Sequence, residues 1–219
     1  MRIARAAEAA GRDAAEVRLL AVSKTWPADS VREAAAAGQR AFGENYVQEG
    51  IDKIREVARP DLEWHFIGPL QSNKTRQVAE AFDWVHSVDR FKIAERLSQQ
   101  RPETLPPLQV CLQVNISGEA SKSGCAPDEA LALCRAVAAL PGLQLRGLMA
   151  IPEPTDDLQA QRIPFCKLRE LREQICAAGL PLDTLSMGMS HDLEAAVAEG
   201  ATIVRIGTAI FGERTPARV

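Results

Sequence analysis

The sequence predicts an α/β protein that folds as a single closed (β/α)8 TIM barrel. Eight short apolar segments, rich in β-branched residues, alternate with seven segments of helical periodicity. The strands start about 20–40 residues apart, and 219 residues leave little room for a second domain. A doubly wound open sheet competes, but it usually carries a Gly-rich nucleotide loop, and neither GxGxxG nor GxxxxGK[ST] occurs. We therefore expect one domain over residues 1–219.

Four strand–helix units are expected in the first half of the chain. Their strands are residues 19–23, 40–43, 64–68 and 84–88. The first helix begins at Pro27 and ends at Gly38, the usual placement of these two residue types. The second has one apolar face at spacings of four, three and four: Val47, Ile51, Ile54 and Ala58. We expect Ser72 or Asn73 to cap the third helix. The fourth carries Ile93, Ala94 and Leu97.

The second half continues the same alternation. Its strands are residues 108–116, 143–151, 183–187 and 201–207. A helix over 127–139 follows the fifth strand. The next helix carries Leu168, Leu171, Ile175 and Ala178, and Pro164 either starts or kinks it. The last helix follows the segment SMGMS, which places Ser190 at its N-cap.

Composition excludes several functional classes. Hydrophobic residues make up 46% and charged residues 25%, which is too apolar for a disordered chain. The net charge is −3, so we expect no broad nucleic-acid surface. No apolar run reaches the ~18–20 residues of a membrane span, and the N-terminus lacks the pattern of a signal peptide. The five cysteines lack any CxxC pair, which is typical of reduced thiols in a cytoplasmic protein.

Lys24 is the first candidate for chemistry, because barrel sites form at the C-terminal ends of strands. The chain has six lysines, and Lys24 is the one that directly follows an apolar strand. Partial desolvation there would lower its pKa and leave a free amine that can attack a carbonyl. The alternatives are a lysine that reaches solvent, or one paired with a carboxylate such as Glu44.

Two turns, after the seventh and eighth strands, are candidates for binding phosphate. One contains Ser186 and Ser190 around a glycine, and the other is Gly207-Thr208. A glycine lets the backbone approach a phosphate closely. An ordinary helix cap and a tight turn are the alternative reading.

Closure of the barrel would make Lys24 and these turns neighbours. A carbonyl-reactive lysine beside a phosphate site suggests pyridoxal 5′-phosphate (PLP), or a phosphosugar bound as in class I aldolases. Arg205 would point the same way as the second turn and could face a pyridine nitrogen, with an interior salt bridge as its alternative. His65 and His86 lie in strands, where hydrogen-bonded core histidines are common. With His191 they show no metal spacing.

Motifs along nearly the whole chain closely resemble those of the YggS/PROSC family of PLP homeostasis proteins, which is similar to the N-terminal barrel of bacterial alanine racemase. They are LLAVSKTWP, FGENYVQE, WHFIGPLQSNK, VNISGEASKSG, LRGLMAIP, LSMGMSHDLEAAVAEGAT and VRIGTAIFG. The resemblance implies a fold-type III PLP barrel in which Lys24 forms the Schiff base. It implies further that Arg205 faces the pyridine nitrogen and that Asn45 and Met149 line the ring. The phosphate would be held by the SMGMS turn with Ser190, and by Gly207 and Thr208.

The family resemblance also implies a carrier or buffer of PLP in vitamin B6 and amino-acid/keto-acid homeostasis, with no robust enzyme activity. PLP racemases need two bases, and the sole tyrosine, Tyr46, lies at the start of the second helix. A weak PLP-dependent racemase or lyase remains the alternative. We expect a monomer whose partners are PLP and apo PLP-dependent enzymes. Lys122 is a rim candidate, and the short segment before the first strand leaves open a start upstream of Met1.

Overall fold

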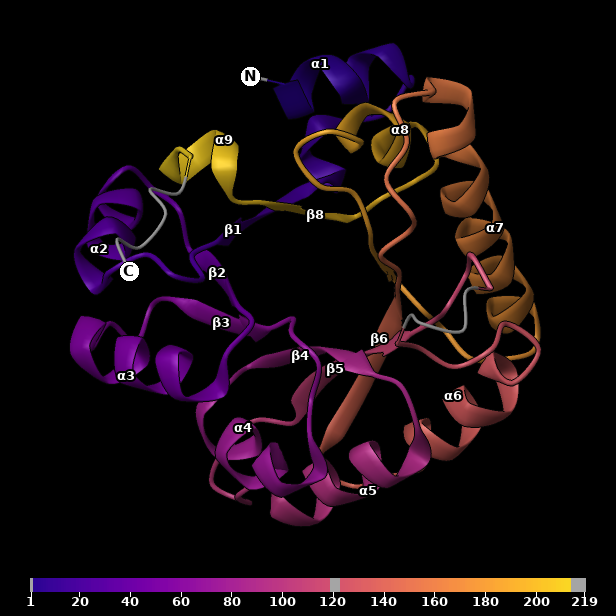
Figure 1. The fold of residues 1–219 in the computed structure, drawn as a ribbon. Coiled ribbons are helices and arrows are strands. Elements are labelled where there is room, and N and C mark those ends of the chain that lie inside the picture. Colours follow the sequence, from indigo (N-terminus) through magenta and orange to yellow (C-terminus); the bar gives the residue numbers. More distant parts are fainter. Residues whose placement is uncertain (1, 119–122, 214–219) are drawn as a thin grey trace.

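The chain forms a closed barrel of eight parallel strands in sequence order, with β1 hydrogen-bonded to β8 (Figure 1). This computed structural model describes residues 2–118 and 123–213, so Lys122 lies outside the described residues. The strands are β1 (Arg18–Val22), β2 (Ala41–Glu44), β3 (Glu63–Phe66), β4 (Trp84–Val88), β5 (Leu108–Gln113), β6 (Leu143–Met149), β7 (Thr184–Ser186) and β8 (Ile203–Ile206). The prediction of a barrel over an open sheet is confirmed.

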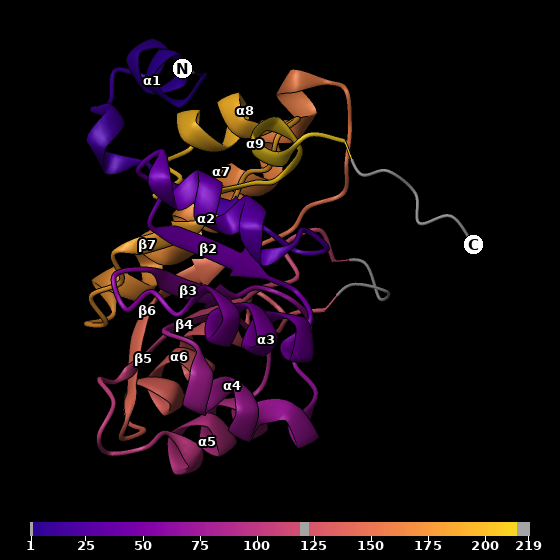
Figure 2. The same ribbon diagram turned by 90° about the vertical axis from the view of Figure 1, so that its left-hand side faces the viewer.

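Helices surround the barrel on the outside (Figures 1 and 2). Those between strands are α2 (Ala28–Ala36), α3 (Val47–Val57), α4 (Thr75–Ala81), α5 (Phe91–Gln100), α6 (Ala130–Ala138), α7 (Leu158–Ala177) and α8 (Leu193–Ala198). The flanking elements are α1 (Arg2–Ala9), η1 (Ala14–Glu16), η2 (Ser72–Lys74) and α9 (Thr208–Phe211). α1 packs beside α8, where Arg2 forms an ion pair of 2.7 Å with Glu194. No helix of the described part is long and apolar enough to cross a membrane.

Two apolar layers follow from the period-two alternation of the strands. One set of side chains fills the barrel interior: Leu20, Val22, Ala41, Ile67, Trp84, Cys111, Met149 and Ile203. The other set, which includes Ala21 and Phe42, packs between strands and helices. Because the interior is filled with side chains, a ligand has room only above or below this layer.

The third helix lacks the predicted cap. Ser72 and Asn73 form part of η2, and α4 begins after Lys74 with no side-chain cap. Thr75 explains the difference, since its single hydroxyl proton is shared between the Ser72 carbonyl oxygen (2.9 Å) and Gln100 Oε1 (2.7 Å). These bonds hold a 3₁₀ turn at the position where the sequence suggests a cap.

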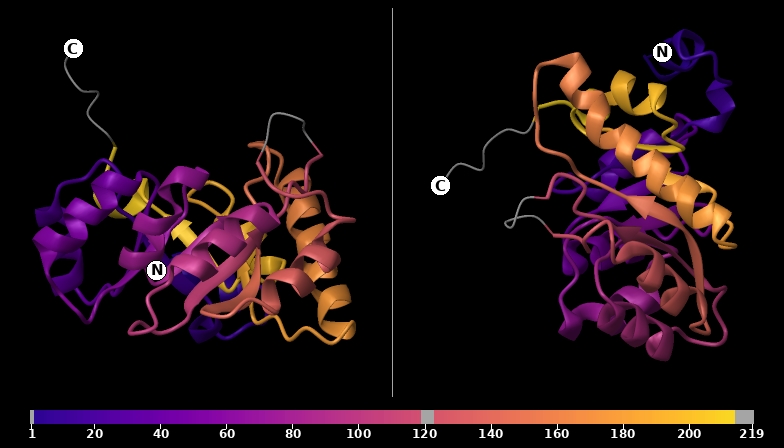
Figure 3. Two further views of the ribbon diagram at one scale, coloured as in Figure 1. Left: turned by 90° about the horizontal axis from the view of Figure 1, so that it is seen from below. Right: turned by 90° about the vertical axis from the view of Figure 1, so that its right-hand side faces the viewer.

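Pro164 lies inside α7, the long helix on the outer surface in Figure 3. The helix starts earlier because the Asp157 carboxylate caps it, accepting from the backbone N–H of Gln159 (2.8 Å) and Ala160 (3.3 Å). Of the two roles open to Pro164, starting the helix is therefore wrong.

Candidate functional site

A cavity of about 210 Å³ opens at the C-terminal ends of the strands. Six of the eight predicted site residues line it: Lys24, Asn45, Ser190, Arg205, Gly207 and Thr208. The rest of its lining is Val22, Ile67, Ile151, Met189 and His191. The cavity therefore combines an amine, a guanidinium and hydroxyl groups with apolar walls.

The other two predicted residues lie beneath the cavity rather than in its lining. Met149 is fully buried in the interior apolar layer. Ser186 is its register partner on β7 and is also fully buried. Both therefore support the floor of the site from below.

The turn that carries Lys24 is held by a second lysine, Lys53 of α3. Lys53 Nζ donates to the Ser23 carbonyl oxygen (2.6 Å) and to Glu49 Oε1 (2.7 Å). Glu49 in turn accepts from the backbone N–H of Thr25. Both neighbours of Lys24 are thus fixed by one buried cation. Thr25 has φ +68°, a strained value for a β-branched residue.

Glu44 completes this group, which we name the Lys53 cluster (Ser23, Glu44, Glu49 and Lys53). Its Oε1 accepts from Lys53 Nζ (2.8 Å) and from the Ser23 hydroxyl (2.6 Å), and its Oε2 has no hydrogen-bond partner among the described residues. Complete burial raises the pKa of Glu44, although Lys53 opposes that shift. The carboxylate considered as a partner for Lys24 therefore forms an ion pair with Lys53.

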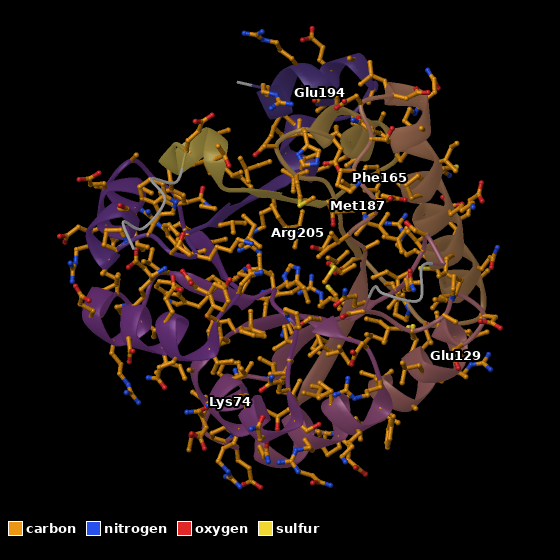
Figure 4. The ribbon with its side chains drawn as sticks, in the orientation of Figure 1. Lys74, Glu129, Phe165, Met187, Glu194 and Arg205 are labelled. Carbon is orange, nitrogen blue, oxygen red and sulfur yellow. The ribbon has the colours of Figure 1, made fainter. Side chains whose placement is uncertain are left out.

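Arg205 projects from β8 into the ring of strands (Figure 4). Its Nη1 donates to the Ser186 carbonyl oxygen (2.6 Å) and hydroxyl (2.8 Å), and its Nη2 donates to the Ala150 carbonyl oxygen (2.9 Å). Burial lowers its pKa to about 10, so it stays charged at neutral pH. Neutral groups, rather than the salt bridge considered as an alternative, hold it among the described residues.

Asn45 and two glycines lie where the backbone is closely packed around the cavity. The Asn45 Oδ1 atom is buried, and no residue in 2–118 or 123–213 donates a hydrogen bond to it. Gly68 is required beside it, because a Cβ there would collide with the Asn45 carbonyl oxygen. At Gly207 a Cβ would lie 3.2 Å from the Val22 carbonyl oxygen. The backbone is therefore packed closely beside Asn45 at Gly68 and beside Val22 at Gly207.

The turn before α8 differs from its prediction. Asp192, not Ser190, is the N-cap residue of α8, and its carboxylate accepts from the Met189 N–H. The tight bend at Gly188, with φ +94°, leaves Ser190 in the turn ahead of the helix. The Ser190 carbonyl oxygen accepts from Arg2 Nη1 (2.6 Å), so α1 helps to fix this part of the cavity.

A larger cavity, of about 730 Å³, opens at the other end of the barrel. Arg18 and Glu63 form an ion pair there (2.7 Å), as do Arg146 and Asp183 (2.6 Å). The N-terminal face of such a barrel usually serves stability. Since these four charges are paired and the large cavity lies away from Lys24, the smaller cavity is the better candidate.

The model of the alanine racemase N-terminal domain matches residues 2–215. The chain is 68% identical to the pyridoxal phosphate homeostasis protein of Pseudomonas aeruginosa, over 97% of this chain and 91% of the relative. The chain belongs to the family of pyridoxal phosphate homeostasis proteins. The Escherichia coli K12 member is 57% identical over 97% of this chain and 92% of its own. The predicted family is thus confirmed.

Solved structures of similar proteins support the fold. PipY of Synechococcus elongatus PCC7942, solved with PLP bound, has a TM-score of 0.84 and 42% identity over 96% of this chain and all of its own. An alanine racemase of Clostridium difficile has a TM-score of 0.74 at 13% identity, over this whole chain and 57% of that chain. The second likeness concerns the fold alone.

Sequence reasoning missed the supports of the site. Glu49 and Lys53, four residues apart on a helix, look like an exposed ion pair, yet Lys53 is buried. The sequence did indicate the burial of His65 and His86, because the period-two alternation of their strands places both on the inward face, as it does Trp84. They are indeed buried and hydrogen-bonded, as predicted.

Proposed function

We propose that this protein binds PLP in the 210 Å³ cavity and buffers or carries it in vitamin B6 and amino-acid/keto-acid homeostasis. The observation that carries the proposal is the convergence of Lys24, Arg205 and the Gly207-Thr208 turn on one cavity. The PLP-bound PipY structure and the names of the relatives support it.

The residues present fit PLP. The cavity offers cationic and hydroxyl donors to an anion, and the buried Asn45 Oδ1 lacks a donor from the part of the chain that the structure describes. Ser190, Gly207 and Thr208 would hold the phosphate. Arg205 would face the pyridine nitrogen, and Asn45 would lie along the ring, with Met149 and Ser186 beneath. When bound, PLP supplies an electrophilic aldehyde carbon, and the amine of Lys24 would bond to it.

We propose a carrier or buffer rather than a racemase or lyase. Arg205 stays protonated and would keep a facing ring nitrogen unprotonated, which weakens the ring as an electron sink. Racemisation also needs a second base. Tyr46 is 58% exposed, and the described lining of the cavity contains no tyrosine. A weak racemase or lyase is the second candidate.

The test is a titration with PLP, followed by borohydride reduction and peptide mass mapping. We expect visible absorption that bleaches on reduction and a PLP adduct on Lys24. The Lys24→Ala variant should lose both signals, and Lys92→Ala, which removes an exposed lysine, should keep them. A wild-type protein that stays unmodified would overturn the proposal.

Catalysis is tested on the loaded protein. Exchange of amino-acid enantiomers or formation of keto acids that disappears in Lys24→Ala would favour the second candidate. Release of PLP to apo-enzymes, a monomeric state, a single domain over 1–219 and location in the cytoplasm remain predictions. Transfer can be measured by reactivating an apo PLP-dependent enzyme with the loaded protein.

A further inference from the structure

A chain of hydrogen-bonded side chains crosses the barrel interior from one mouth to the other. This interior chain consists, in order, of Arg205, Ser186, His86, His65, Glu63 and Arg18. Its successive donor–acceptor distances are 2.8, 2.7, 2.8, 2.5 and 2.7 Å. It links the guanidinium at the small cavity to an ion pair that lines the large one.

With both imidazoles neutral, the two ends of the interior chain fix the direction of every bond. A guanidinium can only donate and an ionised carboxylate can only accept. Glu63 therefore accepts from His65 Nε2–H. A neutral His65 then has a bare Nδ1, which must accept from His86 Nε2–H.

The same logic completes the chain at the upper end. The bare Nδ1 of His86 accepts the Ser186 hydroxyl proton, which leaves the Ser186 oxygen to accept from Arg205. A positive charge on either imidazole would instead direct His86 Nδ1–H at the Ser186 oxygen, and burial of both rings opposes such a charge. With both rings neutral, the geometry requires the proton of each histidine to be on Nε2.

Burial supports this arrangement. His65 and His86 are fully buried, and His65 stacks on Trp84 with ring centroids 5.2 Å apart. Burial lowers the pKa of both imidazoles, further for His86. Burial alone would raise the pKa of Glu63, but the His65 hydrogen bond and Arg18 outweigh it and keep the carboxylate ionised.

We propose that Glu63, His65 and His86 are positioning residues for Arg205, acting through Ser186 to hold its guanidinium in one orientation at the cavity. In this arrangement the Ser186 oxygen accepts from Arg205 while its own proton goes to His86. Glu63, at the large cavity, therefore determines the direction of the hydrogen bonds at the small cavity, where Arg205 lies. The effect on PLP rests on the proposed function.

The first test is nitrogen NMR of the two imidazoles in the protein without PLP. We expect both in the Nε2–H form in the wild type. Glu63→Gln removes the obligatory acceptor, because an amide can donate or accept. His86, two bonds away, should then show a mixture of tautomers. Asp183→Asn removes a carboxylate from the same cavity but lies off the interior chain, and it should leave His86 unchanged.

The second test is the PLP titration of the same variants, with thermal melting to verify that each folds. We expect Glu63→Gln to weaken PLP binding roughly threefold and Ser186→Ala roughly tenfold, with Asp183→Asn close to the wild type. An Nδ1–H tautomer of His86 in the wild type would overturn the proposal. So would a Glu63→Gln protein identical to the wild type in both tests. A wild type that binds no PLP would instead refute the proposed function, while the NMR test still judges the interior chain.

Discussion

The two cationic side chains of the cavity are supported in opposite ways. Beneath Lys24 lies the Lys53 cluster, in which one ammonium contacts two carboxylates at 2.8 and 2.7 Å. Beneath Arg205 lie a hydroxyl and two imidazoles, and the first carboxylate of that chain is at the opposite mouth. One support consists of buried charges and the other is neutral over most of its length.

The difference teaches how each side chain can work. A lysine that must act as an amine needs its backbone fixed, and the Lys53 cluster holds Ser23 and Thr25 on either side of it. An arginine that must stay a donor needs its guanidinium oriented, and neutral acceptors achieve this without a carboxylate beside the ligand. A charged support is rigid but costs desolvation, whereas a neutral support depends on hydrogen-bond direction.

Breaking the charged support should have the largest effect. Lys53→Met leaves the buried Glu44 carboxylate without its cation, and we expect a loss of about 3–5 kcal/mol in the free energy of unfolding. Denaturant titration measures it. Adding Glu44→Gln should recover part of the loss, since it removes the uncompensated charge. Equal stability of Lys53→Met and the wild type would show that the cluster is not a buried ion pair.

A matched pair of serine variants compares the two supports directly. Ser23→Ala removes a donor to a carboxylate (2.6 Å), and we expect a cost of about 2–3 kcal/mol. Ser186→Ala removes a donor to a neutral imidazole (2.7 Å) and one acceptor of Arg205 Nη1, which keeps the Ser186 carbonyl oxygen (2.6 Å), and we expect about 1–2 kcal/mol. Urea unfolding of both variants at pH 7 measures the difference. The reverse order would contradict the contrast between the supports.

Lowering the pH should destabilise the neutral support of Arg205 and remove the cost of burying a charged Glu44 in the Lys53 cluster. The pKa of His86 is well below its ordinary value of 6.5, so the unfolded chain binds more protons below that pH. Stability should then fall with decreasing pH, by up to about 1.4 kcal/mol per pH unit for this group. His86→Gln should flatten that slope in urea unfolding between pH 5 and pH 6.5.

Glu44 provides the control of opposite sign. Its pKa is raised by burial from the ordinary value of 4.5, so the folded protein binds the extra proton above that pH. Its contribution therefore disappears as pH rises through the raised value. Glu44→Gln should gain stability relative to the wild type with increasing pH. Identical slopes for the two variants would show that neither group titrates differently on folding.

The sequence predicts the barrel and most of the cavity for one physical reason. The C-terminal ends of the strands in a parallel barrel lie on one face, so Lys24, Asn45 and Arg205 could be placed together without knowledge of any side-chain contact. The side chains that support these residues depend on tertiary packing, which local sequence patterns do not specify. Lys53 becomes buried only because α3 lies over β2, and the partner of His86 is set by the register of strands far apart in the chain. Local patterns contain neither fact.

Thr25 offers the subtlest test, because its φ of +68° stores strain in the turn after Lys24. Glycine adopts this conformation readily, so Thr25→Gly should stabilise the fold by up to about 1 kcal/mol, reduced by the greater freedom of the unfolded chain. The looser turn should nevertheless slow formation of the PLP adduct on Lys24, measured by borohydride trapping over time.

Thr208→Gly would not serve as a control, because Thr208 lines the cavity. Thr155→Gly, in the loop before α7, tests whether any added glycine slows trapping. If Thr25→Gly gains stability and traps at the wild-type rate, the strain is incidental. If Thr25→Gly slows trapping and Thr155→Gly does not, the Lys53 cluster serves to keep the backbone rigid on both sides of Lys24.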